Sequence, residues 1–210
     1  MNAAAPLRAA LELRAAATPE DPFLFFRGER GHFRWWSFAR CAACLAGESG
    51  ARATSAGEGE AESFLERLAL EGEPPLAAPL AGLLGPPPPR RDIWISHRSV
   101  EVPAQSALAL YCARSGAAVL REPGERLHPE LLAWARPTLL CDEAGELERL
   151  IQGFAALAPG LAPARWRRRR LARLRAVLVQ GEGSGGLAAR LAALGVGPGA
   201  RVLPFPGSGW

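Results

Sequence analysis

The sequence predicts an α/β protein with a mostly parallel sheet and flanking helices. From residue 91 onward, short apolar stretches alternate with helical segments, a pattern typical of parallel strands joined by right-handed crossovers. Apolar residues make up 49% and charged residues 22% of the chain, as in folded globular domains. No run reaches the ~18 uncharged apolar residues that a membrane-spanning helix needs. Long disordered and membrane-bundle architectures are therefore excluded.

The N-terminal residues predict a helix, a hairpin and a second helix. Residues 5–17 carry leucine and alanine on one helical face. The aromatic stretches 23–26 and 33–36 flank a glycine-containing turn, which is typical of a β-hairpin. Ser37 is placed to cap a helix that runs to about Ala46.

Composition then divides the chain into three expected segments. Residues 47–60 are mainly glycine, serine, alanine and glutamate with almost no large apolar side chain, which predicts a flexible linker or a disordered insertion. A helix is expected over 62–70, and the proline run within 85–89 predicts a stiff extended connector. The segments are an N-terminal helix and hairpin (1–46), a linker with short helices (47–90) and an α/β subdomain (91–210).

The α/β subdomain is predicted to contain five strands and four helices in alternation. Pro103 suits the first turn of its helix, because proline is tolerated there. The strands are expected at 92–96, 117–120, 138–141, 176–180 and 201–205, and the helices at 103–114, 128–135, 143–156 and 187–194.

All 25 basic residues are arginine, and the sequence contains no lysine. This excludes mechanisms that need a lysine, such as a Schiff base, a P-loop lysine or a lysine that holds an adenylate. The net charge of +4 is modest for this length and does not by itself indicate nucleic-acid binding.

The cysteines and histidines do not predict a metal site. Cys41 and Cys44 form a lone C-x-x-C inside an expected helix, without the second pair that zinc sites use. We interpret them as small apolar residues on a buried helix face. The three histidines, His32, His97 and His128, have no spacing typical of metal ligands.

A glycine-rich loop offers a candidate nucleotide site. Gly181, Gly183 and Gly186 form G-x-G-x-x-G between an expected strand and helix, where backbone N–H groups can meet a phosphate. No acidic residue follows Glu182 to bind a ribose hydroxyl, so a turn without ligand is the competing interpretation. Neither Ser184 nor Ser208 completes G-x-S-x-G, and no catalytic residue is assigned.

An arginine-rich stretch over 165–175 is a candidate anion-binding patch. It surrounds Trp166 with seven arginines, including Arg167, Arg168, Arg169 and Arg170. Such a patch can bind nucleic-acid phosphates or anionic lipid. The alternative is a solvated helix face whose Leu171 and Leu174 touch the core.

Four segments, in order, resemble the AMP-dependent synthetase and ligase family, the acyl-CoA synthetases and related adenylate-forming enzymes. The first resembles the family's opening motif and reads ATPEDPFLFFRGERGHFRWWSFARCAACLAG. The second and third resemble its central segments and read DIWISHRSVEVPAQSALALYCARSGAAVL and HPELLAWARPTLLCDEAGELERLI. The fourth resembles the family's adenine-side loop and reads LRAVLVQGEGSGGLAARLAALGVGPGARVLPFPGSGW. The resemblance implies part of the family's N-terminal domain.

The resemblance also implies roles for individual residues. His97 and Gly116 fall at the acyl pocket, and Gly181, Glu182 and Gly183 fall on the loop beside the adenine. Gly207 and Ser208 stand in the family's aromatic-Gly-x-Thr-Glu motif, whose magnesium-binding glutamate falls on Trp210 or beyond the sequence.

Departures from the family pattern predict a degenerate member. The expected phosphate loop is replaced by the acidic linker, and the remaining nucleotide-binding half and the lid with its catalytic lysine are not in these 210 residues. We therefore expect an acyl-binding or interaction module without independent adenylation, with no required cofactor and only weak ATP or AMP binding. A full-length synthetase or an acyl carrier protein is the expected partner, and nucleic acid is not. Alternatives are a nucleotide-binding enzyme using Gly181–Gly186 and an arginine-rich binder of nucleic acid or anionic lipid.

The N-terminal residues lack the continuous apolar core of a signal peptide, because Arg8, Glu12 and Arg14 interrupt it. A cytoplasmic protein is expected.

Overall fold

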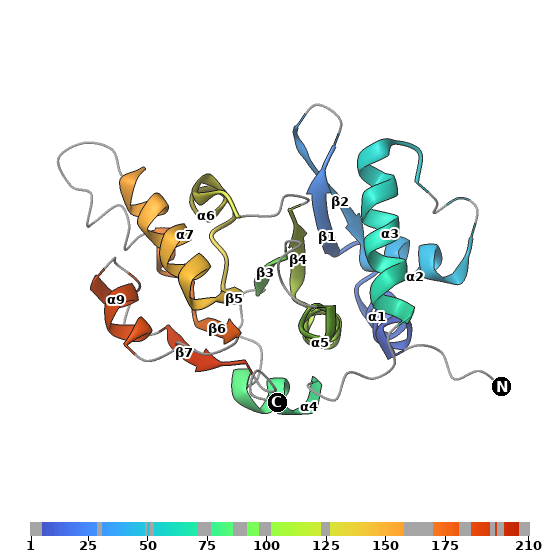
Figure 1. Ribbon diagram of the computed structural model, residues 1–210. Helices are drawn as coiled ribbons and strands as arrows, with labels where there is room; N and C mark the ends of the chain where they lie inside the picture. Colours follow the sequence, from blue (N-terminus) through green and yellow to red (C-terminus); the bar gives the residue numbers. More distant parts are fainter. Residues whose placement is uncertain are drawn as a thin grey trace. The chain divides into compact units, whose positions relative to one another are not determined.

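The computed structural model contains two compact units that are each built from strands and helices (Figure 1). Unit 1 comprises Met1–Ser96 and Glu101–Pro123, and unit 2 comprises His97–Val100 and Gly124–Trp210. The structure describes residues 6–28, 31–48, 50, 53–70, 77–85, 92–96, 102–122, 127–157, 170–180, 186–193, 196 and 200–205. The predicted α/β class with a mostly parallel sheet and flanking helices is confirmed, with seven strands in the described residues.

The N-terminal helix and hairpin of unit 1 form as predicted. Helix α1 spans Pro6–Ala17, and strands β1 (Pro22–Arg27) and β2 (Phe33–Ser37) pair antiparallel. Helix α2 (Phe38–Ala46) begins where the Ser37 hydroxyl accepts the backbone N–H of Arg40 at 3.2 Å. It ends at Gly47, whose φ of 81° places it in the left-handed region.

Helix α3 corrects the predicted linker. It spans Ala56–Leu70 and therefore begins inside the segment expected to be flexible. Its first turn packs closely on β1, because a Cβ on Gly57 would lie 2.3 Å from the backbone oxygen of Arg27. The next residue, Glu58, is buried. A polar contact and a close backbone approach hold this turn in place. Because it has no large apolar side chains, its composition suggested a linker.

The rest of unit 1 is a parallel β-α-β arrangement. Helix α4 spans Ala77–Leu84, strand β3 Ile93–Ser96, helix α5 Val102–Ser115 and strand β4 Ala118–Arg121. Strand β4 lies between β1 and β3 and is parallel to both, so the strand order in this unit is β2-β1-β4-β3. Apart from Gly85, the proline connector expected at 85–89 lies outside the described residues.

The core of unit 1 is aromatic and includes the C-x-x-C pair. Phe23 and Phe38 contact each other with ring centroids 5.1 Å apart, and both are fully buried. Cys41 and Cys44 are both buried, which confirms the interpretation that they are core residues. Burial raises the pKa of the Cys41 thiol, so the reactive thiolate is disfavoured.

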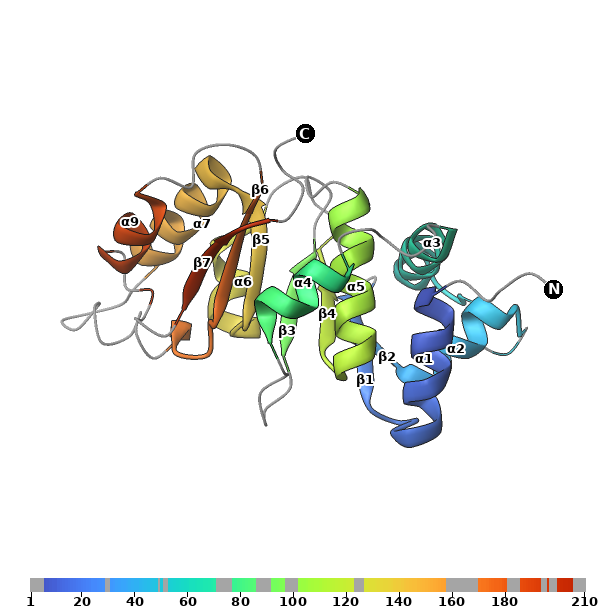
Figure 2. The same cartoon turned by 90° about the horizontal axis from the view of Figure 1, so that it is seen from below.

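Unit 2 repeats the alternation of strands and helices (Figure 2). Its strands β5, β6 and β7 are parallel and adjacent in that order, and all side chains of β6 are buried. Helix α7 packs against both α6 and α9. In chain order the elements are α6 (Pro129–Ala135), β5 (Leu139–Glu143), α7 (Ala144–Ala156), β6 (Ala176–Gln180), α9 (Leu187–Ala193) and β7 (Arg201–Pro204).

A search of the described helices finds none that is both long enough and apolar enough to cross a membrane.

Candidate binding site at the carboxyl ends of the strands in unit 1

Polar side chains gather where the parallel strands of unit 1 end. Open α/β sheets bind ligands outside the carboxyl ends of their strands, so these residues are the first candidates. We define the carboxyl-end cluster by its residues. They are the strand residues Arg27, Ser96 and Arg121, the next residue Glu122, Phe64 and Arg67 of α3, and Gln105 and Ser106 of α5.

A half-buried ion pair closes one side of the cluster. The Arg27 Nε donates to both carboxylate oxygens of Glu122 at 3.2 and 3.1 Å. The Glu122 side chain is 5% exposed, whereas Arg27 remains 38% exposed. The backbone N–H of Glu122 also donates to the Ser96 carbonyl at 2.8 Å, so β3 and β4 hold Glu122 in place. Arg27 therefore neutralises the one carboxylate among the cluster residues.

Phe64 holds two guanidinium groups beside the strand ends. The Arg121 guanidinium carbon lies 4.9 Å from the centre of the Phe64 ring, and that of Arg67 lies 5.8 Å from it. Arg67 also donates to the side-chain oxygen of Gln105 at 3.3 Å, which links α3 to the first turn of α5. Arg121 is buried at 3% exposure. Such cation–π contacts hold a guanidinium group in a fixed orientation.

Two buried hydroxyl groups complete the cluster. Ser96 Oγ and Ser106 Oγ are buried and make no hydrogen bond within the described part of the chain. Ser96 pairs in register with Arg121, so their side chains point to the same face of the sheet. An unsatisfied buried polar group costs roughly 1–3 kcal/mol, which a polar ligand atom can recover. The cluster thus combines guanidinium charge with hydroxyl groups that lack partners.

The residues predicted for an acyl pocket are not brought together. His97 follows Ser96 but lies outside the described residues. Gly116 lies at the opposite end of α5, with a φ of 75°, where a Cβ would contact the Arg14 guanidinium at 3.4 Å. The 14 residues of α5 separate the two ends by ~21 Å at 1.5 Å per residue. The acyl roles of His97 and Gly116 stay predictions.

The predicted adenine-side loop follows β6 in unit 2. Gly181, Glu182 and Gly183 lie outside the described residues, as do Gly207 and Ser208. Gln180 ends β6 in register with Glu143, so the loop leaves the carboxyl end of a strand, as the sequence predicted. Helix α9 beyond it has only seven residues. Nucleotide binding by this loop stays a prediction.

The arginine-rich patch is described only at its end. Arg167, Arg168 and Arg169 lie outside the described residues. Arg170 is exposed and donates to the backbone oxygen of Ala133 at 3.2 Å. Leu171 and Leu174 are buried, in agreement with the alternative in which this segment contacts the core. Among the described residues, no group of three or more His, Cys, Asp or Glu is arranged to hold a metal ion.

Sequence reasoning missed most of the carboxyl-end cluster. Arg121 and Glu122 directly follow the apolar stretch Ala118–Leu120, and this abrupt change at a strand end was the available signal. Phe64 and Arg67 gave no such signal, because a helix of unknown position cannot be assigned to a strand end from its sequence.

Comparisons with known proteins agree on the fold. No family model and no curated protein match the chain. The crystal structure of CmiS6 superposes on 93% of this chain and 70% of its own, with 18% identity and a TM-score of 0.60. The crystal structure of IdnL1 superposes on 94% of this chain and 59% of its own, with 14% identity and a TM-score of 0.55. The chain has their fold. At these identities the likeness concerns architecture alone.

Proposed function

We propose that these 210 residues form a degenerate, acyl-CoA synthetase-like module that binds an organic acid at the carboxyl-end cluster without adenylating it. The observation that carries the proposal is the buried guanidinium of Arg121, which shares a sheet face with the Ser96 hydroxyl, together with the buried Ser106 hydroxyl of α5. Neither hydroxyl has a hydrogen-bond partner among the described residues. Arginine matches a planar carboxylate with two parallel hydrogen bonds, and hydroxyl groups donate to the same oxygens. An organic acid therefore suits this site better than a cation or a neutral sugar.

We propose the absence of adenylation from the charge of the side chains that stand where the family has its phosphate loop. Attack of a carboxylate on ATP needs magnesium and basic groups around the phosphates. The sequence has no lysine, and the segment in the place of the family's phosphate loop contributes helix α3, with four glutamates and one arginine. Negative side chains there oppose the approach of a triphosphate.

Glu58 of α3 is ionised but paired with Arg40 and Arg34 at 3.1 and 3.7 Å, so it fixes the start of the helix and adds little to this repulsion. Burial alone raises its pKa, but hydrogen bonds from the Thr54 hydroxyl (2.6 Å) and N–H (2.9 Å) and the charge of Arg40 outweigh burial. The pKa of Glu58 falls to about 2. Glu58 therefore stays ionised at neutral pH.

The proposed module requires neither a bound nucleotide nor a metal of its own. The bound organic acid is exchanged with a partner protein. The proposed partner is a full-length synthetase or an acyl carrier protein.

Two measurements test the proposal. ATP–pyrophosphate exchange is measured with fatty and aromatic acids, and no acid-dependent exchange is expected. Octanoate is titrated by NMR, following the amide signals of Arg121 and Glu122. The double variant Ser96→Ala/Ser106→Ala is expected to bind at least fivefold more weakly. Ser63→Ala, an exposed serine on α3, is the matched control and keeps the wild-type affinity.

Acid-dependent exchange would overturn the claim that the module does not adenylate. Octanoate that leaves the Arg121 and Glu122 signals unmoved, or that binds the double variant as tightly as the wild type, would overturn the site.

A further inference from the structure

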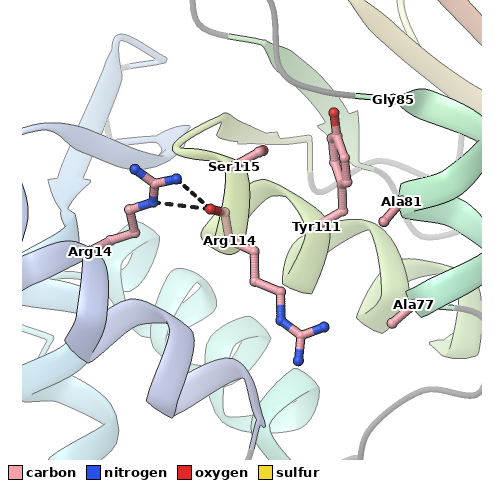
Figure 3. A pocket seen from close by; sticks show the side chains of 7 residues that line it. All are labelled: Arg14, Ala77, Ala81, Gly85, Tyr111, Arg114 and Ser115. Atoms are coloured by element: carbon pink, nitrogen blue, oxygen red, sulfur yellow. Dashed lines mark hydrogen bonds between the residues drawn. The ribbon is translucent and has the colours of Figure 1, made fainter.

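A pocket lies in unit 1 at the end of α5 opposite the carboxyl-end cluster. Arg14 of α1, Ala77 and Ala81 of α4, Gly85, and Tyr111, Arg114 and Ser115 of α5 line it (Figure 3). Its volume is about 280 Å³. An apolar cavity of ~150 Å³ already holds benzene, so this pocket has room for a ring and one further polar group. It is separate from the carboxyl-end cluster because α5 lies between them.

The pocket has an apolar wall and a cationic wall. The methyl groups of Ala77 and Ala81 form the α4 side, whereas Arg14 and Arg114 come from the opposite helices. In Figure 3 the Arg114 guanidinium extends toward Ala77, and the Tyr111 hydroxyl lies at the Gly85 end. No carboxylate belongs to the described residues that line the pocket. An anion with an apolar body fits both walls.

Local contacts organise the cationic wall before any ligand binds. Arg14 donates from Nε at 3.2 Å, and also from Nη2, to the backbone oxygen of Arg114. This contact sets the Arg14 charge against the negative end of the α5 dipole, which would otherwise repel an anion. The Tyr111 hydroxyl lies 3.5 Å from Asp92 Oδ2 and donates to it, which fixes the phenol. Arg114 is exposed, so a ligand can reach it from solvent.

We propose that this pocket binds a small amphipathic oxyanion, a phosphate or carboxylate carried on a compact apolar group. The Arg114 guanidinium binds the oxyanion, and Ala77 and Ala81 contact the apolar group. Arg14 holds the end of α5 in place through the Arg114 carbonyl. The site is independent of the organic-acid site proposed above.

The test uses phenyl phosphate and benzoate as probes and benzyl alcohol as a neutral control of similar shape. Binding is followed by NMR through the amide signals of Ser115 and Gly116. Both anions are expected to bind saturably and at least tenfold more tightly than benzyl alcohol. The stronger of the two identifies whether phosphate or carboxylate is the preferred headgroup.

Two pairs of variants test whether the cationic wall and the apolar wall each contact the ligand. Arg114→Gln is expected to weaken anion binding at least fivefold, whereas Arg8→Gln, which removes an exposed arginine from α1 outside the pocket, leaves it unchanged. Ala81→Phe fills the pocket and abolishes binding, whereas Ala78→Phe on the exposed side of the same helix does not. Circular dichroism checks that each variant is folded.

Equal affinity for benzyl alcohol and the anions would overturn the proposal, as would wild-type binding by folded Ala81→Phe or an equal loss in Arg8→Gln. The proposal would also be overturned if neither anion binds at 10 mM. This concentration is roughly the weak limit of specific recognition. The Ser96→Ala/Ser106→Ala variant keeps binding here whether or not the organic-acid site exists, so the two proposals fail separately.

Discussion

Gly57 lies directly against the backbone of Arg27. A Cβ on Gly57 would lie 2.3 Å from the Arg27 carbonyl oxygen and 3.2 Å from the Cα of Gly28. No real Cβ contact is this short, and neither neighbouring atom belongs to a side chain that can rotate away. The close approach of α3 to the end of β1 therefore depends on glycine. It also positions Phe64, two turns further along α3, beside the carboxyl ends of the strands.

Gly57→Ala is expected to destabilise the protein. The helix must move away from β1, and overpacking of this kind costs roughly 1–3 kcal/mol. Urea denaturation followed by circular dichroism measures the change. Gly59→Ala is the matched control, because no atom lies within 4 Å of its Cβ position in the same helix. It is expected to stabilise by up to about 1 kcal/mol through helix propensity. Equal effects of the two substitutions would show that the close approach is not maintained in solution.

Glu58 makes stability depend on acid pH. Its pKa is about 2 in the folded protein against an ordinary value of 4.5, so the folded state favours the ionised form. The stabilisation is present above pH ~4.5 and is lost as the pH falls toward 2, and the shift corresponds to on the order of 3 kcal/mol at 1.36 kcal/mol per pH unit.

Glu58→Gln is therefore expected to be less stable than the wild type at pH 7, with a difference that shrinks below pH 4.5. Urea denaturation at pH 7, 5, 4 and 3.5 checks this. Glu66→Gln, an exposed glutamate of the same helix, serves as the control. A pH-independent difference for Glu58→Gln would contradict the prediction.

Gly153 of α7 faces the ring of Pro129 in α6. A Cβ there would lie 2.6 Å from the proline Cγ, and a proline ring has little freedom to yield. We expect Gly153→Ala to destabilise unit 2 by roughly 1–3 kcal/mol through overpacking. Gly145→Ala in α7, where no atom lies within 4 Å of the Cβ position, is expected to be neutral or stabilising. Thermal melting compares them, and a higher melting temperature for Gly153→Ala would refute the contact.

The sequence by itself determined the order and type of most elements. The alternation of apolar strands with helices from residue 91 is a local property of the chain, and β6 spans Ala176–Gln180 in both the prediction and the structure. The Ser37 cap was also predictable, because the capping serine and the N–H it accepts lie three residues apart. The family resemblance led to the correct fold.

Only the tertiary structure decided where α3 begins and which residues meet at the carboxyl ends of the strands. Glu58 is held in part by Trp36 and Arg40, which belong to earlier elements of the chain. Because composition does not show these contacts, it predicted a linker for the segment that contains Glu58. Arg121 meets the Phe64 ring although the two residues lie far apart in the sequence. Residue spacing carries no information about such contacts, because they exist only after the helix has packed on the sheet.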